Sequence, residues 1–293
     1  MSATQPGILA EETQLARYLS FSIHSTDDIR ASLSDLVQLL DPATTVCGFG
    51  LSLINVLGKE IPELRSFPAH TANGIDIPST PSALWCWLRG NDRGEIYHRA
   101  RKIEQILADN FILDDVLDSF QYDGSRDMSG YEDGTENPVG DDAITAAIVA
   151  EAGAGMNGSS FVAVQQWVHD FDQLESMSQL ERDHAIGRQL SDNEEIEDAP
   201  LSAHVKRTAQ EDFEPEAFIL RRSMPWAEGM EAGLYFVSFT NTLDKFEAQL
   251  NRMLGIDDGV VDALFDFTRP ISGAYYWCPP IKDNKLDLSM LGI

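Results

Sequence analysis

Near its midpoint, the chain carries a short acidic run that could hold one carboxylate in a fixed place. The run spans residues 130–138 and reads GYEDGTENP. Its two glycines flank Asp133 and permit backbone conformations that a side chain would forbid, and the closing Asn-Pro pair interrupts regular structure. A carboxylate positioned in this way could accept and donate a proton during a reaction. An ordinary acidic surface turn explains the same composition, so other residues must decide between the two interpretations.

Two further features lie downstream of this run. His204 stands alone in the polar stretch 202–207, and an isolated loop histidine is most often a surface residue, although it can also bind a metal. Arg221 and Arg222 stand in tandem at the end of an apolar stretch, so one of them must point toward buried side chains. A buried arginine requires an anion, which could be a protein carboxylate, a propionate or a reacting oxygen.

The spacing of apolar residues predicts the elements that carry these side chains. Alternation predicts strands, and apolar residues three and four positions apart predict amphipathic helices. The first half of the chain has the order βαββαβ, with strands at 17–24, 45–53, 84–88 and 111–121 and helices after Ser25 and at 95–108. The second half repeats this order, with strands at 161–168, 218–222, 234–240 and 271–277 and helices at 174–186 and 243–254.

Two copies of this pattern predict an α+β fold made of two ferredoxin-like halves. Each half would be an antiparallel sheet covered on one face by two helices, and the two sheets would bury their remaining faces against each other. We place the boundary near residue 125, which gives an N-terminal half at 1–125 and a C-terminal half at 126–293. The acidic run then opens the second half. A long insertion at 188–216, which contains His204, interrupts that half, and insertions of this length are usually functional or disordered.

Composition restricts the class of protein. The 293 residues are 43% hydrophobic, which is enough for a sizeable core, and the formal net charge is −27. Such a charge disfavours nucleic acids and anionic membranes as partners. The three cysteines have no CxxC spacing, so neither a disulfide framework nor a zinc site is indicated. The N-terminal residues show no signal-peptide pattern and no long apolar run occurs, so we expect a soluble protein in the cytoplasm.

Taken together, the motifs resemble those of the dye-decolourising peroxidase family. Residues 130–134 match that family's GxxDG motif, extended by 135–138 as in its shorter bacterial members. Further matching segments follow in the family's order at 5–9, 186–188, 193–195, around His204, at 219–221 and at 272–276. The resemblance covers nearly the whole chain. It implies a dimeric α+β barrel of two ferredoxin-like halves, with haem b (iron protoporphyrin IX) bound in the C-terminal half.

The resemblance assigns a role to three residues. It makes His204 the proximal iron ligand, Asp133 the distal acid or base and Arg221 the distal cation. Each role is chemically reasonable, because a neutral imidazole can ligate haem iron and a positioned carboxylate can move a proton between the oxygens of peroxide. An arginine stays charged and can stabilise the negative charge that grows as the O–O bond breaks.

Other residues are weaker candidates for contact with the haem. Arg188 and Arg207 could pair with its propionates, although ordinary ion pairs explain them equally well. Asp266 lies where some family members place an acid against the proximal histidine, and a surface aspartate is an equal alternative. The haem pocket could also be lined by Leu234, Phe236 and Ser223. For Leu234 and Phe236 the alternative is packing in the core. His169 belongs to a family motif without a ligand role.

These observations predict a haem-dependent peroxidase that reduces hydrogen peroxide and oxidises small or bulky organic reductants, such as dyes and phenolics, in one-electron steps. The alternatives are a protein that handles or stores haem or porphyrin, and a non-enzymatic binding module built on the same scaffold. Because family members commonly assemble, the resemblance also implies a homo-oligomer. Surface-reaching Trp and Tyr side chains such as Trp226, Trp277, Tyr275 and Tyr276 could relay electrons, but packing in the core explains them better.

Overall fold

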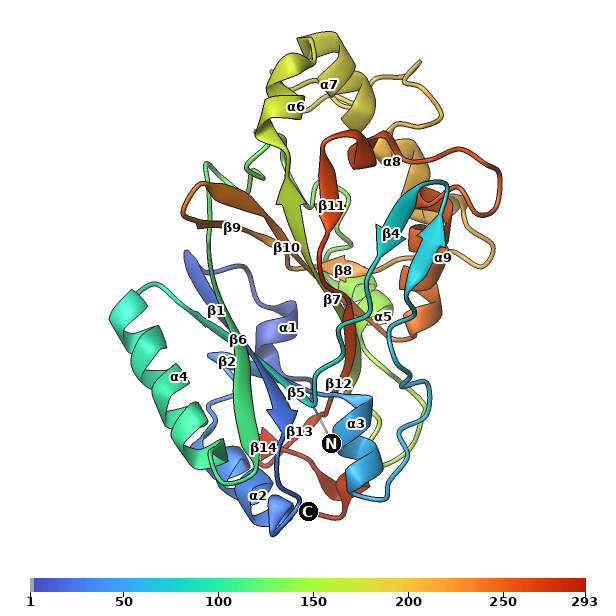
Figure 1. The fold of residues 1–293 in the computed structure, drawn as a ribbon. Coiled ribbons are helices and arrows are strands. Elements are labelled where there is room, and N and C mark those ends of the chain that lie inside the picture. Colours follow the sequence, from blue (N-terminus) through green and yellow to red (C-terminus); the bar gives the residue numbers. More distant parts are fainter. Residues whose placement is uncertain (1–2) are drawn as a thin grey trace.

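The structure, a computed structural model, describes residues 3–293, and a closed β-barrel lies at its centre (Figure 1). Ten strands form one sheet, and all of them except β8 and β11 close into the barrel because β7 pairs with both β12 and β10. Around the barrel the order is β7, β12, β2, β5, β1, β6, β9 and β10. These strands are β1 (Leu15–Ile23), β2 (Thr45–Phe49), β5 (Leu84–Gly90), β6 (Phe111–Phe120), β7 (Ser160–His169), β9 (Met224–Glu228), β10 (Glu231–Thr240) and β12 (Ala274–Cys278).

The two halves of the chain have the same strand order, as the repeated pattern of the sequence indicated, but the second strand of the second half is β9 and not the predicted 218–222. The first half places its antiparallel strands in the order β2, β5, β1, β6, and the second half in the equivalent order β9, β10, β7, β12. Helices α2 (Ile29–Leu39) and α4 (Arg93–Leu107) cover the first sheet, and α9 (Leu243–Met253) covers the second, on the opposite side of the barrel in Figure 1. The exact boundary near residue 125 stays a prediction.

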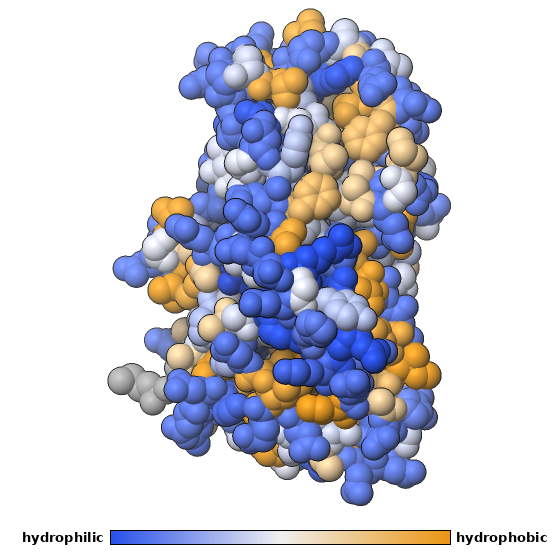
Figure 2. Space-filling view, turned by 90° about the vertical axis from the view of Figure 1, so that its left-hand side faces the viewer, coloured by the Kyte–Doolittle hydropathy of each residue, from blue (hydrophilic) through white to orange (hydrophobic). Residues whose placement is uncertain are grey.

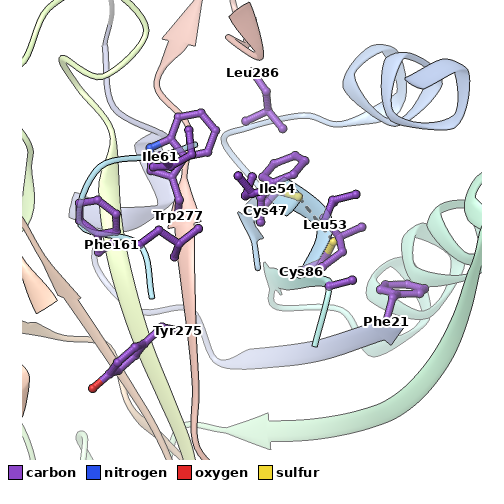
Figure 3. Close-up of a cluster of buried hydrophobic side chains, with 14 of the residues drawn as sticks. Phe21, Cys47, Leu53, Ile54, Ile61, Cys86, Phe161, Tyr275, Trp277 and Leu286 are labelled. Atoms are coloured by element: carbon purple, nitrogen blue, oxygen red, sulfur yellow. Dashed lines mark hydrogen bonds between the residues drawn. The ribbon is translucent and has the colours of Figure 1, made fainter. Parts of the chain in front are cut away.

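Alternation along the strands divides the core into two layers. Inward side chains fill the barrel with stacked aromatic rings, including Tyr18, whose ring centroid lies 4.0 Å from that of Tyr235. Outward side chains pack under the helices, and Figure 3 shows residues of both halves in this outer cluster, among them Phe21, Phe161 and Trp277. Trp226, Trp277, Tyr275 and Tyr276 are all buried in these layers, which supports packing over electron relay for each of them.

Three predicted elements differ from the structure. The strand predicted at 218–222 is only β8 (Leu220–Arg221), at the edge of the sheet beside β10, and the barrel strand of this region is β9. The strand expected at 45–53 ends at Phe49, because Gly50 approaches Ser82 O so closely that a Cβ would lie 2.0 Å from it, and α3 (Leu51–Val56) begins directly afterwards. The helix expected at 174–186 is two helices, α6 (Phe171–Ser176) and α7 (Gln179–Ile186). Ser178 separates them, because its side chain accepts a hydrogen bond from Glu181 N in a capping box that starts α7.

The remaining elements are short, and sequence periodicity predicted few of them. They are α1 (Pro6–Leu9), β3 (His70–Ala72), β4 (Ile75–Ile77), α5 (Asp141–Ala147), α8 (His204–Arg207), β8 (Leu220–Arg221), β11 (Thr268–Pro270), β13 (Ile281–Lys282), β14 (Lys285–Leu286) and three single-turn 3₁₀ helices at Gln210–Asp212, Ala263–Asp266 and Ser289–Leu291. The last residues pack onto the chain itself, since Leu291 is fully buried and Arg30 donates a hydrogen bond to its carbonyl. Within residues 3–293, no helix is both long enough and apolar enough to cross a membrane.

Candidate active site

A deep cavity of about 890 Å³ lies outside the barrel, between the sheet of the second half and α9. Side chains alternate across a strand, so Gln165, Trp167 and His169 of β7 all reach this cavity while their neighbours fill the barrel. Leu234 and Phe236 of β10 line it by the same rule, as the sequence predicted, and α9 contributes Phe246, Gln249, Leu250 and Met253. A second hollow of about 980 Å³ adjoins the cavity and shares Asp133, His204 and Arg221 with it. All the residues that line the cavity lie after residue 125.

Asp133 lies in the wall of both hollows, on a loop whose glycines have the backbone that the sequence predicted. Gly130 and Gly134 have φ of 93° and 81°, in the left-handed region that disfavours any side chain. The backbone N–H of Asp133 donates to Ser125 O at 3.0 Å. Arg221, on β8, lies beside it, with 3.7 Å between Arg221 Nη1 and Asp133 Oδ1 and about a fifth of each side chain exposed. The structure therefore brings these two predicted residues together.

The rest of the acidic run anchors this loop to other elements. Asn137 Oδ1 accepts from Arg221 N at 2.8 Å, and Asn137 Nδ2 donates to Arg221 O at 3.0 Å. Tyr131 is buried and donates its hydroxyl hydrogen to Asp183 on α7 at 2.6 Å. Burial, together with this hydrogen bond, raises the pKa of Tyr131. The loop is thus attached on one side to the strand that carries Arg221 and on the other to α7.

His204 is the first residue of α8 and faces the same cavity. Its Nδ1 lies 2.8 Å from Asp262 Oδ2, and the Asp262 side chain is fully buried. The other oxygen of Asp262 accepts from Leu264 N at 2.8 Å, which fixes the carboxylate. Within the described part of the chain, His204 Nε2 has no hydrogen-bond partner and is available to a ligand in the cavity.

The acid beside His204 is Asp262, so the expectation for Asp266 was wrong. The two aspartates are at opposite ends of a short stretch, and the 3₁₀ turn at Ala263–Asp266 directs Asp262 toward His204 and leaves Asp266 exposed. Burial and then the neighbouring Asp262 raise the pKa of Asp266. Asp266 instead lines a groove on the outer surface.

The two predicted propionate partners differ in position. Arg188 lines the second hollow, where it pairs with Glu136 at 2.5 Å and Glu195 at 3.4 Å. Arg207 lines neither hollow, because its guanidinium makes two hydrogen bonds to Asp258 and two more to Arg252 O. The charge of Arg207 is thus already matched within the protein, outside both hollows, and its contact with the cofactor stays a prediction.

Ser223 also lies away from the cavity. It is buried, and its hydroxyl accepts from Val237 N at 3.3 Å inside the sheet. The strand that begins at Leu220 is only two residues long, so the alternation that would have placed Ser223 beside Arg221 does not continue.

Sequence reasoning missed a buried pair in the cavity wall, Asp127 and His169. His169 Nε2 lies 2.9 Å from both carboxylate oxygens of Asp127, and His169 Nδ1 lies 2.7 Å from Thr268 Oγ1. Although burial opposes ionisation, the hydrogen bonds from His169 and Ser129 hold the pKa of Asp127 below its ordinary value. The period-2 pattern of β7 could have revealed His169, since it has the same parity as Gln165 and Trp167.

The fold and these groups define an α+β-barrel protein with a cavity that is flanked by a His–Asp pair and an Asp–Arg pair. Residues 124–283 match the family model described as Dyp-type peroxidase, C-terminal. The chain is 33% identical over 295 residues to the dye-decolorizing peroxidase of Mycobacterium tuberculosis, covering 94% of this chain and 88% of that protein. The chain belongs to the Dyp-type peroxidase family.

Solved structures give the same result. A dyp-type peroxidase protein from Shewanella oneidensis superposes with a TM-score of 0.91 and 28% identity, covering 99% of this chain and 98% of that chain. A variant of DypB from Rhodococcus jostii RHA1, solved in complex with heme, superposes with a TM-score of 0.86 and 25% identity, covering 93% and 94%. The α+β barrel predicted from the sequence is therefore confirmed.

Proposed function

We propose that this chain is a haem-dependent peroxidase in which His204 holds the iron and Asp133 and Arg221 act on hydrogen peroxide. One observation carries this proposal. His204, which the buried Asp262 holds from behind, lines the same cavity as the Asp133–Arg221 pair, so a bound group could be ligated and its substrate protonated within one site. Organic molecules that donate single electrons would complete the reaction.

The cavity fits a large, mostly apolar ring with polar groups at its edge. Leu234, Phe236, Phe246, Leu250 and Met253 supply apolar contact surface. Two buried donors in the same wall, Gln165 Nε2 and Trp167 Nε1, have no hydrogen-bond partner in the described chain. A polar group of a bound ligand could satisfy these two donors. Haem, the group bound by the R. jostii relative, has this combination of an apolar ring and polar edge groups.

His204 would bind haem iron through Nε2, because Asp262 accepts the hydrogen on Nδ1. This hydrogen bond fixes the tautomer and the direction of the ring, and it increases the basicity of the ligating nitrogen. Haem, when bound, supplies an iron centre that can accept two oxidising equivalents from peroxide and return them one at a time. The protein contribution on this side is therefore to hold a single imidazole nitrogen toward the cavity.

Asp133 and Arg221 would act on the peroxide itself. The Asp133 carboxylate can take the proton from one peroxide oxygen and deliver it to the other, which then leaves as water; positioned proton transfer of this kind contributes about 10² to 10⁴ in rate. The Arg221 guanidinium would stabilise the negative charge that grows as the O–O bond breaks. It is already in place, since its backbone is fixed by Asn137.

Arg188 is the better placed of the two candidates for an anionic edge group such as a propionate. It lines the second hollow and is held by Glu136 and Glu195. We further propose a cytoplasmic location, which the three buried thiols support because reducing compartments preserve free cysteines. Homo-oligomerisation remains a prediction from the family resemblance, and light scattering of the purified protein tests it.

The test is a haem titration of the purified protein. The wild type is expected to take up one haem per chain with a sharp Soret band that changes on addition of peroxide. His204→Ala is expected to lose most haem affinity, and His184→Ala, at a partly exposed histidine on α7 outside the cavity, serves as the matched control. A wild type without a Soret band after reconstitution would contradict the proposal. Stable haem binding with no spectral response to peroxide would instead favour a haem-storage role.

A further inference from the structure

A groove of about 940 Å³ lies on the surface directly outside the cavity wall. It is bounded by the end of β7, the start of α6, the β9–β10 turn and the segment from the 3₁₀ turn at Ala263–Asp266 into β11. His169 and Thr268 line both this groove and the cavity. The two spaces are therefore separated, at this point, by the thickness of one side chain.

The wall between the two spaces is fixed in position. Thr268 donates its hydroxyl hydrogen to Val168 O at 3.0 Å, and its oxygen lies 2.7 Å from His169 Nδ1. His169 Nε2 lies 2.9 Å from the Asp127 carboxylate on the cavity side. Next to this pair, the ring of Trp167, which lines the cavity, stacks on Phe265, which lines the groove, with 5.5 Å between ring centroids.

The chemistry of the groove favours one class of ligand. Four carboxylates, those of Asp170, Asp172, Glu231 and Asp266, line it against the single cation Arg269. Apolar surface comes from Phe171, Phe265, Phe267 and Met230, and Met230 is 96% exposed. The β9–β10 turn lies at the left of Figure 1 and so on the face turned to the viewer in Figure 2, where apolar side chains stand among hydrophilic ones in the upper half. Carboxylates together with aromatic faces complement an aromatic cation.

We propose that this groove binds small aromatic cations that serve as electron donors for the peroxidase. The inference rests on the proposed function. A phenol held in the groove would lose one electron across the wall and one proton from its O–H group to solvent, and it would leave as a phenoxyl radical. Two such donors balance the two oxidising equivalents of each peroxide molecule, so no further reactant is needed.

Binding can be tested without turnover. The probe is phenyltrimethylammonium, which cannot be oxidised as a phenol, added to haem-reconstituted protein that carries ¹³C-methyl methionine. The Met230 methyl resonance, assigned with Met230→Leu, is expected to shift in a saturable manner, and the groove variant Asp172→Asn/Glu231→Gln is expected to weaken this binding about three- to tenfold. Asp35→Asn/Asp109→Asn, which neutralises two exposed carboxylates of the first half, is the control of equal charge. An unshifted Met230 resonance, or equal weakening in the control, would overturn the proposal.

Kinetics provide the second measurement, with three phenols that differ in charge. 3-Hydroxyphenyltrimethylammonium, phenol and 4-phenolsulfonate are compared as donors at fixed peroxide. The groove variant is expected to lose three- to tenfold in kcat/KM for the cationic phenol, mainly through KM, with little change for phenol itself. An unchanged KM for the cationic phenol would overturn the proposal. A wild type that oxidises none of the three phenols, yet binds the probe at Met230, would contradict the proposed function and leave the groove assignment intact.

Discussion

The side-chain amide of Asn137 and the backbone of Arg221 exchange two hydrogen bonds, of 2.8 and 3.0 Å. The acidic loop and the strand that carries the distal arginine are thus joined as one unit, although Asn137 itself does not line the cavity. This explains the asparagine near the end of the run, because its side-chain amide pairs with the backbone of β8 where the loop ends.

Asn137→Ala should therefore impair peroxide chemistry from outside the cavity. Loss of two hydrogen bonds is expected to cost about 1 to 3 kcal/mol in the free energy of unfolding and to slow the reaction with peroxide, because Arg221 is no longer held beside Asp133. Urea unfolding and stopped-flow absorbance measure the two effects. Thr135→Ala, an exposed change in the same loop, is the control, and an equal effect of both variants would refute the role of Asn137.

Asp133 and Arg221 make separable contributions to the peroxide reaction. Asp133→Asn keeps the shape of the side chain but removes the proton acceptor, so the second-order rate constant with peroxide should fall by about 10² to 10⁴. Arg221→Leu removes the charge and should also slow this step. Arg222→Leu is the comparison, because the Arg222 guanidinium faces away and donates to Ile8 O and Leu9 O. Wild-type rates for both Asp133→Asn and Arg221→Leu would leave peroxide cleavage without a catalyst in this site.

Asp262 and Asp266 offer a direct test of the proximal assignment. Asp262→Asn should weaken haem retention about 10- to 100-fold, because an amide cannot replace the carboxylate that holds His204 Nδ1–H. Asp266→Asn, four residues later and exposed, should retain haem as the wild type does. Haem transfer to apomyoglobin measures both, and the opposite ranking would restore the expectation drawn from the sequence.

The sequence predicted the fold better than it predicted the partners of the site residues. Strand alternation and helical spacing revealed both βαββαβ halves, because those patterns are local. Local patterns did not predict that the two sheets close into a barrel, because each junction between the halves has a single pair of facing residues. These pairs are Phe49 with Trp277 and Ser119 with Trp226. Local patterns also identified the GxxDG loop, because positive φ requires glycine at Gly130 and Gly134.

The choices that the sequence left open depend on contacts between distant residues. Arg188 and Arg207 are equally plausible in the sequence, and what separates them is position, because Arg188 lines the second hollow whereas Arg207 is held by Asp258 outside both hollows. In the same way, Asp127 lies 42 residues from His169, and nothing local connects the two.

The Asp127–His169 pair should contribute stability that depends on pH. The pKa of Asp127 is lowered in the folded state, so its contribution is present above the unfolded pKa and is lost as pH falls through the folded one. Asp127→Asn removes the carboxylate that accepts a hydrogen bond from His169 in a buried site, which should cost about 1 to 3 kcal/mol at pH 7. Urea unfolding at pH 7 and at pH 3 measures this cost. Asp123→Asn, which breaks an exposed pair with Arg126, is the control, and an equal loss in both variants would contradict the assignment.

Glu12 has the opposite dependence on pH. It lies on the N-terminal segment that Arg222 and Arg89 hold by donating to the carbonyls of residues 8–11. Burial, and then the negative charge of Asp133, raise the pKa of Glu12 to about 7, although Arg222 and Arg89 oppose the shift. Because the negative charge of Asp133 helps to raise the pKa of Glu12, the stability of this N-terminal segment depends on whether Asp133 is ionised.

Glu12→Gln should consequently stabilise the protein at pH 8 but not at pH 4.5. Between the ordinary value of 4.5 and about 7, the folded state binds the Glu12 proton more tightly than the unfolded state does, so the free energy of unfolding falls as pH rises through this window. Glutamine does not titrate, so the variant should exceed the wild type by about 1 to 3 kcal/mol at pH 8. Urea unfolding across this range measures the difference, with the exposed Glu11→Gln as control. A constant offset between wild type and Glu12→Gln at every pH would show that packing, and not the buried charge, sets the effect of this residue.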